Sequence, residues 1–450
     1  MEPLSLEKIC DVLQGRLLHA SISPKKIWIE NIFTDSRRPI SGGLFWALEG
    51  ERWDGHQFLE EVQGMAKAAV VHRVPEGVSS ELPLVLVRDT AYALGELASY
   101  YRSSFSLPLI AVTGSNGKTT TKEMIGYLLS RYASTLRSPQ SFNNRIGVPL
   151  TLFSLERGTC FAVVELGASG MGEIAQLCRI ARPTAGVLTS IAPAHLEGFR
   201  DLEGVMEAKG ELLEYLEGAG GPIFINVDNI YCRRMASRYS GEVIGFGISR
   251  EASIRASELS CSFDGIRFRC GSHVVHLPML GRHNVYCALA AIAVAQYYGL
   301  PAEIWSSWEG FRPPGMRLQP VWRGGICFLN DAYNANPASM VAAIETLGRL
   351  PVVGRRVLVL GDMLELGEDT WHYHQELARW IDERFSAVFV VGRHMQAVVE
   401  ELPSSVDWYS CGTVREVVEL LEGFLRPQDV VLLKGSRRMK LEQILLDFAA

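Results

Sequence analysis

The stretch that decides the fold of the central part of the chain reads Leu107-Pro-Leu-Ile-Ala-Val-Thr-Gly-Ser-Asn-Gly-Lys-Thr-Thr120. Its first seven residues are almost entirely apolar and predict a buried strand, and helical periodicity follows from Thr120 to Tyr132. The Gly-x-x-Gly-Lys-Thr-Thr between them is a shortened phosphate-binding pattern, because Val112 occupies the position of the first glycine in the longer pattern.

This loop carries the residue types that hold phosphate groups. Gly114 and Gly117 allow a tight turn in which backbone N–H groups face phosphate oxygens at the start of a helix. Lys118 supplies a compact positive charge, and the hydroxyl group of Thr119 suits Mg²⁺. A glycine turn that only caps a helix is the alternative. The strand–loop–helix order favours a nucleotide triphosphate site formed by Gly114, Ser115, Asn116, Gly117, Lys118, Thr119 and Thr120.

The sequence after this loop repeats the alternation of apolar strands and helices. Strand-like runs occur at residues 161–164, 185–189 and 223–226, and helical periodicity occurs at 206–216 and 285–298. Strands that are apolar along their whole length are typical of a parallel sheet covered by helices on both faces. The pattern therefore predicts a parallel P-loop-type sheet with flanking helices.

Two further zones flank this central one. The first has short strands broken by Ser-Gly-Gly and Asp-Gly, which predicts a small α/β domain. The third follows a Pro-Pro-Gly turn, alternates strands and helices again, and includes a helix expected at 371–385. It lacks Gly-x-Gly-x-x-Gly, so we predict a Rossmann-like domain without a dinucleotide role. The 450 residues are expected to form three α/β domains at 1–88, 89–312 and 313–450.

The composition excludes several classes of protein. Hydrophobic residues make up 48% and charged residues 21% of the chain, as in ordinary globular proteins. The 44 Lys and Arg residues against 50 Asp and Glu residues argue against a nucleic-acid or polybasic membrane binder. No apolar run approaches the roughly 20 residues that cross a membrane, and the N-terminus does not resemble a signal peptide. We expect a monomeric cytoplasmic protein without stable membrane insertion, in which the nine cysteines are reduced core residues.

Nearly every predicted strand of the second and third zones ends in polar or glycine residues. These strand ends read Thr-Gly-Ser-Asn-Gly-Lys, Glu-Leu-Gly-Ala-Ser, Asn-Val-Asp-Asn, Gly-Asp-Met-Leu-Glu and Lys-Gly-Ser-Arg. Ligands of open parallel sheets bind outside the carboxyl ends of the strands. Two such edges that face each other would form a cleft between domains, and we predict the site there.

Three residues near these strand ends are candidates for a metal site. Glu165 closes an apolar strand, where a buried acid needs a cation, although a surface-exposed strand end is the alternative. His195 follows another strand and could bind Mg²⁺ or Mn²⁺ as a neutral imidazole, or it could be a hydrogen-bonded structural group. Lys209 lies on a predicted helix and has no distinguishing neighbour, which favours a solvated face.

Polar residues outside the central zone carry weaker signals. Arg317 lies beside the Pro-Pro-Gly turn and could reach a phosphate across the cleft. Asp331-Ala-Tyr-Asn-Ala-Asn-Pro follows a predicted strand, although these residues are also ordinary turn formers. His372-Tyr-His-Gln-Glu is faintly metal-like, but a solvated helix face is favoured. Thr34-Asp-Ser-Arg and Gly50-Glu-Arg-Trp-Asp-Gly-His would suit a sugar or phosphate ligand.

Together these motifs resemble the Mur ligase family, in the same order and over nearly the whole chain. The phosphate loop alone would not separate Mur ligases from folylpolyglutamate synthetases. The Phe-Asn-Asn-x-x-Gly-x-Pro, Tyr-Asn-Ala-Asn-Pro and Gly-Asp-Met-Leu-Glu-Leu-Gly stretches are most similar to the family members that use D-Ala-D-Ala. The stretches that carry the resemblance are Thr34-Asp-Ser-Arg, Thr113-Gly-Ser-Asn-Gly-Lys-Thr-Thr, Ser141-Phe-Asn-Asn-Arg-Ile-Gly-Val-Pro, Glu165-Leu-Gly-Ala-Ser, His195-Leu-Glu-Gly-Phe, Glu207-Ala-Lys-Gly-Glu, Gly281-Arg-His-Asn, Asp331-Ala-Tyr-Asn-Ala-Asn-Pro, Gly361-Asp-Met-Leu-Glu-Leu-Gly and Leu433-Lys-Gly-Ser-Arg.

The resemblance implies an ATP-dependent ligase of peptidoglycan synthesis that joins D-Ala-D-Ala to UDP-MurNAc-tripeptide through an acyl phosphate. It implies ATP and two Mg²⁺ ions, with Lys118, His195 and Lys209 as catalytic residues. It also implies that Lys209 reacts with CO₂ to form a carbamate. The implied metal-site residues are Thr119, Glu165, His195 and the carbamylated Lys209.

The resemblance further assigns substrate contacts. Asn284 matches an adenine contact, Arg317 a phosphate contact and Asp331 a ribose contact. The positions that match substrate-binding residues are Ser36 and Arg37 for the UDP portion, Asn143 and Asn144 for the muramyl peptide, and Tyr333, Asn334 and Asn336 for the wall near the dipeptide.

The chain departs from the family pattern at three positions. Cys287 stands where a second Asn is common, Gly43 where an acidic residue is frequent, and Ser141 where Asn is usual. These departures concern adenine contacts and substrate fit. Another Mur-type or folylpolyglutamate-type ligase, a P-loop phosphotransferase or NTPase, and a catalytically silent nucleotide-binding protein are the alternative functions.

Overall fold

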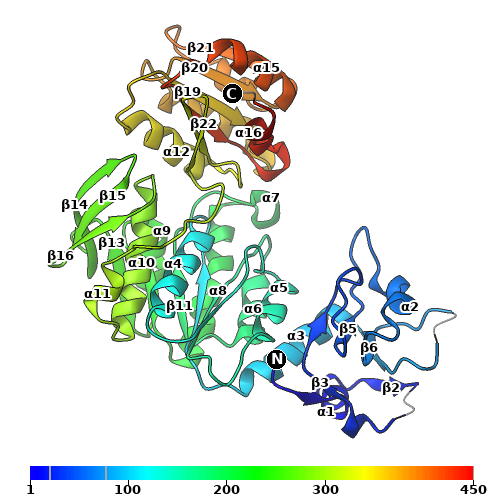
Figure 1. Ribbon diagram of the computed structural model, residues 1–450. Coiled ribbons are helices and arrows are strands. Elements are labelled where there is room, and N and C mark those ends of the chain that lie inside the picture. The colour runs from blue at the N-terminus through cyan, green and yellow to red at the C-terminus, as the bar shows by residue number, and fades with distance from the viewer. Residues whose placement is uncertain (20–21, 77–78, 449–450) are drawn as a thin grey trace.

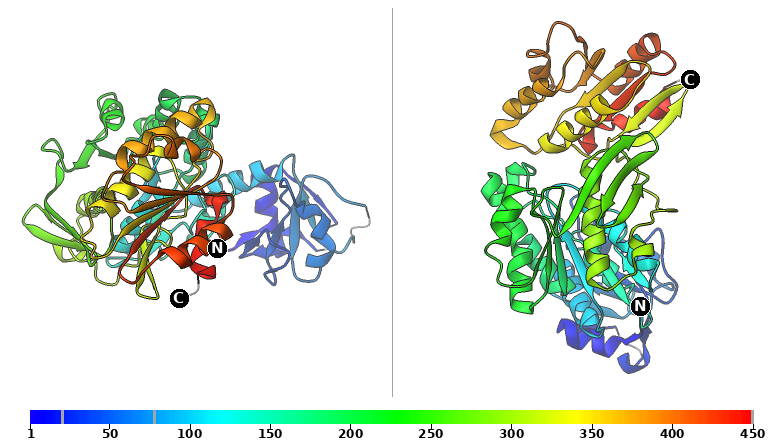
Figure 2. Two further views of the ribbon diagram at one scale, coloured as in Figure 1. Left: turned by 90° about the horizontal axis from the view of Figure 1, so that it is seen from above. Right: turned by 90° about the vertical axis from the view of Figure 1, so that its left-hand side faces the viewer.

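The computed structural model describes residues 1–19, 22–76 and 79–448 and contains three α/β units in chain order (Figure 1). The N-terminal unit lies to one side of the central unit, and the C-terminal unit lies over the central one (Figures 1 and 2). Each main sheet falls within one of the three predicted domains, and the mixed α/β architecture is confirmed. The exact domain bounds stay a prediction.

The N-terminal unit is built on a five-stranded sheet with the order β2-β7-β6-β5-β4, in which β2 alone is antiparallel to its neighbour. Side chains alternate between its faces: Leu44 and Trp46 pack with α1 and α3, whereas Phe45 packs with α2. The elements are β1 (Leu4–Ser5), α1 (Leu6–Leu13), β2 (Arg16–Leu18), β3 (Trp28–Ile29), β4 (Ile32–Phe33), β5 (Leu44–Trp46), α2 (Leu59–Val62), β6 (Ala68–Val71) and β7 (Leu84–Leu86).

Helix α3 (Thr90–Ser103) joins the N-terminal unit firmly to the central one. Its Leu97 belongs to a single buried cluster that contains both Leu6 of α1 and Leu109 of the central sheet. The hydroxyl group of Tyr101 donates to Leu155 O at 2.6 Å and accepts from Glu2 N at 2.6 Å. The two units therefore share one hydrophobic core.

The central sheet has nine strands in the order β16-β15-β14-β13-β12-β11-β8-β10-β9. Helices α4 and α10 cover one face, and α5, α6 and α8 cover the other, as the apolar strands predict. The elements are β8 (Leu109–Thr113), α4 (Lys118–Ser130), β9 (Thr135–Arg137), α5 (Gly147–Leu152), β10 (Phe161–Glu165), α6 (Glu173–Ala181), β11 (Ala185–Leu188), α7 (Leu196–Phe199), α8 (Leu202–Ala219), β12 (Ile223–Asn226), α9 (Ile230–Ala236), β13 (Val243–Gly247), β14 (Ile254–Ser262), β15 (Gly265–Cys270), β16 (His273–Leu277), α10 (His283–Tyr297) and α11 (Ala302–Trp305).

The C-terminal sheet has the order β17-β18-β22-β19-β20-β21 and is parallel except for β17. Helices α12 and α14 pack on one face, and α15 and α16 pack on the other. The elements are β17 (Gln319–Arg323), β18 (Ile326–Asn330), α12 (Pro337–Arg349), β19 (Arg356–Gly361), α13 (Thr370–Gln375), β20 (Ala387–Val391), α14 (Gln396–Val399), β21 (Asp407–Cys411), α15 (Val414–Phe424), β22 (Val430–Lys434) and α16 (Ile444–Asp447).

The structure corrects three expectations. The central sheet is not wholly parallel, because β14, β15 and β16 extend it as an antiparallel meander. The helix expected at 371–385 breaks: α13 passes into a 3₁₀ turn at Glu376–Trp380, and the backbone is extended at Ile381. Cysteines are not all core residues, since Cys160 and Cys261 are exposed.

Among the described residues, no helix combines the length and apolar character that crossing a bilayer requires.

Candidate active-site cleft

The carboxyl ends of the central and C-terminal sheets border one cleft with a volume of about 900 Å³. That volume lies within the range of small-molecule sites. Predicted site residues from both sheets meet there, although they are far apart in the chain. Those that line the cleft are Ser115, Asn116, Gly117, Lys118, Thr119, Thr120, Asn143, Asn144, Glu165, His195, Asn284, Arg317, Asp331, Tyr333, Asn334 and Asn336.

The phosphate loop connects β8 to α4 with two glycines in the left-handed region, at φ 140° for Gly114 and 81° for Gly117. A Cβ atom on Gly114 would lie 2.1 Å from the Thr189 hydroxyl oxygen, so no other residue fits there. Helix α4 begins at Lys118, and the first N–H groups of a helix have no acceptor within it. The N–H groups of Ser115 and Asn116 donate to Ser190, so the free amide donors that an anion site requires are those at the start of α4.

Lys118 folds back over this loop. Its Nζ donates to Gly114 O at 2.8 Å and to Ser115 O at 3.2 Å. Burial lowers the pKa of Lys118 from its ordinary value, and the neighbouring Arg317 lowers it further against the opposing effect of Glu165. A partly buried cation held by two backbone carbonyl groups gains from an anionic ligand.

Glu165 is buried at the end of β10, which excludes the surface-exposed alternative. Its Oε2 accepts from the Thr119 hydroxyl group at 2.8 Å, and its Oε1 accepts from Asn143 Nδ2 at 2.8 Å. A carboxylate and a hydroxyl group are ligands that Mg²⁺ prefers. The described residues contain no group of three His, Cys, Asp or Glu side chains that could hold a metal ion without further ligands. The pair thus fits an ion that also takes phosphate oxygens or water.

His195 caps α7 in a left-handed conformation, with φ 53°. Its Nδ1 lies 2.5 Å from Oε2 of Glu365, which belongs to the C-terminal unit. Burial lowers the pKa of His195, and so do the charges of Lys118 and Lys209, while Glu365 opposes them. The imidazole is therefore favoured in its neutral form, which is the form that binds metal ions.

Lys209 is only 2% exposed, so the expectation of a solvated face is wrong. Its Nζ donates to Ala168 O at 3.2 Å and lies 4.9 Å from the centre of the Phe199 ring. Ala168 lines the cleft, whereas Lys209 lies behind it. Burial, reinforced by the charge of Lys118, lowers the pKa of Lys209 from 10.5 to about 7. A large part of its amine is therefore uncharged at neutral pH.

The C-terminal wall of the cleft contains a buried ion pair. Lys434 Nζ, at the end of β22, lies 2.5 Å from Asp331 Oδ2 and also donates to Asn334 O at 3.2 Å. Asp331 Oδ1 accepts from Leu318 N at 3.1 Å. The Arg317 guanidinium stacks 3.9 Å from the centre of the Tyr333 ring, and its buried Nε has no hydrogen-bond partner among the described residues.

Polar side chains connect the two sheets across the cleft. Asn116 and Asn336 exchange hydrogen bonds through their amide groups, at 2.8 and 3.3 Å. The hydroxyl groups of Ser141 and Tyr333 lie 3.3 Å apart. Contacts between residues about 200 positions apart in the chain thus bring the phosphate loop against the predicted dipeptide wall.

Asn284, the predicted adenine contact, and Cys287, which departs from the family pattern, both lie on α10. Asn284 Nδ2 donates to Leu280 O at 2.7 Å at the start of α10. Cys287 lies one turn later, with its Sγ 3.9 Å from Gly117 O under the phosphate loop. Cys287 therefore supports the loop while also lining the cleft.

The predicted UDP-binding residues are not part of this cleft. Ser36 and Arg37 follow β4 in the N-terminal unit, and the Arg37 side chain is 85% exposed. Arg37 pairs with Asp35 at 2.9 Å, and its hydrogen bonds hold the pKa of that carboxyl group at about 2. Binding of the UDP portion by Ser36 and Arg37 stays a prediction.

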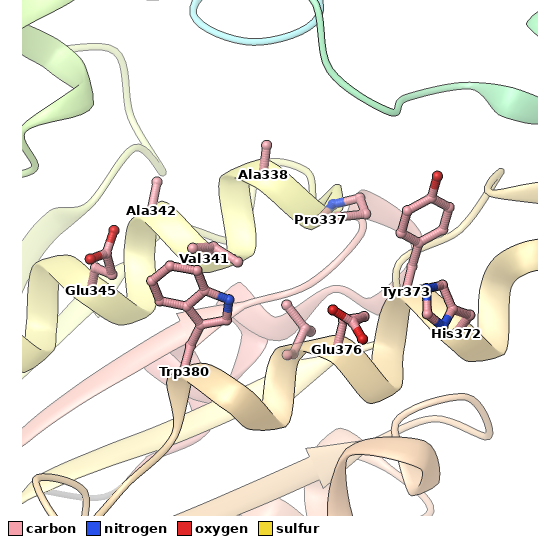
Figure 3. A pocket seen from close by; sticks show the side chains of 10 residues that line it. Pro337, Ala338, Val341, Ala342, Glu345, His372, Tyr373, Glu376 and Trp380 are labelled. Carbon is pink, nitrogen blue, oxygen red and sulfur yellow. The ribbon is translucent and has the colours of Figure 1, made fainter. Parts of the chain in front are cut away.

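A second hollow of about 490 Å³ lies in the C-terminal unit between α12 and α13 (Figure 3). His372 and Glu376 lie along it, but His374 is fully buried, which corrects the expected solvated face. His374 Nε2 accepts from Met363 N at 3.0 Å, so its Nδ1–H donates to Thr370 O. This histidine is a structural group of the C-terminal core.

Lys434 and Glu365 are among the cleft residues to which the sequence alone assigned no role. Lys434, like Glu165, is a charged residue at the end of an apolar strand, which indicates a buried partner of opposite charge. That partner is Asp331. Glu365 follows the Gly-Asp-Met-Leu stretch, and its contact with His195 spans 170 positions. No local pattern predicts that contact.

The fold and the cleft define a nucleotide-binding α/β protein of the P-loop type, with a second sheet closing over the phosphate loop. The chain belongs to the Mur ligase family. Residues 112–295 match the Mur ligase middle domain, and residues 316–437 match the domain described as Mur ligase, glutamate ligase domain.

Full-length relatives agree with this assignment. The chain is 34% identical to the UDP-N-acetylmuramoyl-tripeptide--D-alanyl-D-alanine ligase of Bacillus subtilis, over 98% of each chain. Its structure is similar to that of MurF from Acinetobacter baumannii, with a TM-score of 0.91 and 31% identity over 100% and 99% of the two chains. It is also similar to MurF from Thermotoga maritima in complex with ADP, with a TM-score of 0.83 and 26% identity over 93% and 96%.

We expect Gly114→Ala to weaken ATP binding by about tenfold or more, because the added Cβ atom forces Thr189 and the loop apart. Isothermal titration calorimetry measures the Kd. Gly158→Ala is the matched control, since a Cβ atom there meets no atom within 4 Å. An unchanged Kd in a folded Gly114→Ala variant would contradict the assigned loop geometry.

Lys209→Met should stabilise the fold in CO₂-free buffer near pH 6. Charged Lys209 is disfavoured when folded, and this penalty is complete below its folded pKa of about 7. The penalty fades as the pH rises from about 7 toward the ordinary value of 10.5. The melting temperature of the variant should thus exceed that of the wild type by several degrees at pH 6, and the gap should narrow by pH 10. Lys26→Met, at an exposed position, should show no such trend.

Proposed function

We propose that this protein is an ATP-dependent ligase that joins D-alanyl-D-alanine to UDP-N-acetylmuramoyl-tripeptide, giving the pentapeptide used in peptidoglycan synthesis. The observation that carries the proposal is the single cleft in which the phosphate loop and Glu165 face Asp331, Tyr333 and Asn336 of the second sheet. A nucleotide and an acceptor held by different sheets can meet there. The full-length Bacillus subtilis relative, which is named as a D-alanyl-D-alanine ligase, supports the choice of substrates.

The first step activates a carboxylate. The terminal carboxylate of the tripeptide attacks the γ-phosphorus of ATP, the bond from that phosphorus to the β-phosphate bridge oxygen breaks, and ADP leaves. The product is an acyl phosphate. Phosphoryl transfer needs positioning and charge neutralisation more than covalent catalysis. Lys118 and the amide groups at the start of α4 would supply both.

Mg²⁺ fits the donor atoms on the central side of the cleft. Thr119, Glu165 and His195 would hold it, together with phosphate oxygens. When bound, Mg²⁺ neutralises charge on the transferred phosphoryl group. The hydrogen bond from Asn143 leaves Glu165 fixed in place for this role.

The second step forms the amide bond. The amine of D-alanyl-D-alanine attacks the carbonyl carbon of the acyl phosphate, and the tetrahedral intermediate expels phosphate while the amine loses a proton. Acyl phosphates react with water, so the site must exclude it. The contacts of Asn336 with Asn116 and of Tyr333 with Ser141 close the cleft on this side.

We further propose that Lys209 is carbamylated. The uncharged fraction of the amine can attack CO₂, and the product loses a proton to give an anion. Lys209 would then face Lys118 as an anion instead of a second cation, and could bind a second Mg²⁺. Its fully buried position behind Ala168 protects such an adduct from water.

Other residues would bind the remaining parts of the substrates. Asn284, Arg317 and Asp331 would contact adenine, phosphate and ribose, and Ser36 and Arg37 would bind the UDP portion at a distance from the cleft. Asn144 and Asn334 would contact the muramyl peptide and the dipeptide. The cytoplasmic location and the monomeric state stay predictions.

Phosphate release with MgATP and UDP-N-acetylmuramoyl-tripeptide should depend on added D-alanyl-D-alanine, and mass spectrometry should detect the pentapeptide. Tripeptides ending in lysine and in diaminopimelate should both be tested, with glutamate as a control acceptor. Release without the dipeptide would indicate an NTPase. Release that requires glutamate in place of the dipeptide would indicate a ligase with a different acceptor.

Lys209→Ala should lower turnover by about a hundredfold or more, because an anion near the phosphates is lost. Formate or acetate should restore part of the activity in the variant but leave the wild type unchanged. In protein equilibrated with ¹³C-bicarbonate, the ¹³C nuclear magnetic resonance spectrum should show a carbamate signal in the wild type and not in the variant. Full activity of Lys209→Ala would reject the carbamate.

A further inference from the structure

Glu365 connects the C-terminal unit to the phosphate-binding side of the cleft. It follows β19 in the loop that leads to α13, and its carboxylate meets the Nδ1 of His195 at 2.5 Å. Its carbonyl oxygen lies 3.5 Å from Glu197 N in α7. Gly367, two residues later, also lies against α7, because a Cβ atom there would be 3.9 Å from Glu197 N. The loop at 365–367 therefore packs on the helix that His195 caps.

Both partners of this contact have unusual backbones. His195 has φ 53° and Glu365 has φ 65°, although neither is glycine. Such conformations cost energy and persist where the surroundings determine them, which is most frequent at functional sites. Two such residues from different units meet through their side chains. The side chains of His195 and Glu365 are 35% and 45% exposed, and their backbone conformations distinguish them from other surface ion pairs such as Arg415 with Glu419.

The hydrogen bond fixes which ring nitrogen of His195 carries a proton. An ionised carboxylate only accepts hydrogen bonds, so Nδ1–H donates to Glu365. The other nitrogen, Nε2, has no hydrogen-bond partner among the described residues and is unprotonated in the neutral ring. A histidine that holds a metal ion through one nitrogen typically donates from the other to a carboxylate.

We infer that Glu365 is a positioning residue of the cleft, which holds His195 in the Nδ1–H tautomer while the C-terminal unit is docked. Docking of that unit thereby prepares the Nε2 atom of His195 as a ligand on the phosphate side. The inference rests on the proposed function only in taking His195 to face the nucleotide and its metal ion.

Nuclear magnetic resonance of ¹⁵N-histidine-labelled, ligand-free protein tests the tautomer directly. The His195→Ala spectrum identifies the signals of His195. In the wild type we expect an unprotonated Nε2, and in Glu365→Ala we expect the alternative tautomer to become populated. Glu365→Gln should retain part of the original signal, because its amide oxygen can still accept from Nδ1–H. Glu368→Ala, an exposed acid in the same loop, should leave the spectrum of His195 unchanged.

Binding of Mn²⁺ with a non-hydrolysable ATP analogue tests the consequence. We expect Glu365→Ala to weaken Mn²⁺ binding about tenfold, and Glu365→Gln to weaken it less. The double variant with His195→Ala should bind as weakly as His195→Ala alone, because Glu365 acts through His195. Additive losses, or an unchanged tautomer in Glu365→Ala, would overturn the inference. Neither measurement uses D-alanyl-D-alanine, so failure of the proposed ligase reaction is a separate result.

Discussion

The cleft depends on charged side chains that end otherwise apolar strands. Glu165 ends β10 and Lys434 ends β22, and each is nearly excluded from water. An isolated buried charge is costly enough that each must have partners. Thr119 and Asn143 satisfy Glu165, and Asp331 satisfies Lys434. Because these partners line the cleft, the contacts that make the strand ends tolerable also build the site.

The lysines around the phosphate loop also have polar partners, but neither Lys118 nor Lys209 forms an ion pair with a carboxylate of the described residues. Lys118 is held by two backbone carbonyl groups, and Lys209 by one carbonyl group and an aromatic ring. The charge of Lys118 disfavours that of Lys209, and Arg317 disfavours that of Lys118. A triphosphate relieves all of these repulsions at once. We therefore expect the protein to gain much of its stability in this region from its ligand.

The sequence predicted those features that local patterns determine. Continuous apolar runs located β8, β10, β11 and β12, and the glycines of the phosphate loop located the turn before α4. The antiparallel meander escaped prediction because β14 is half exposed and carries polar residues, so it lacks a continuous apolar run. The burial of Lys209 and the role of Glu365 escaped for a different reason. The burial of one and the partner of the other arise only when distant segments pack together.

The way the units are joined indicates which of them can move. The N-terminal unit shares one apolar cluster with the central unit through α3. Among the described residues, Leu280 is the one buried member of the C-terminal clusters that precedes residue 318. Across the cleft the contacts are mainly polar, including the Asn116–Asn336 and His195–Glu365 pairs. Polar contacts exchange readily with water, whereas a shared apolar core does not. Opening for substrate exchange is therefore expected between the central and C-terminal units, and closure would assemble the residues that the reaction needs.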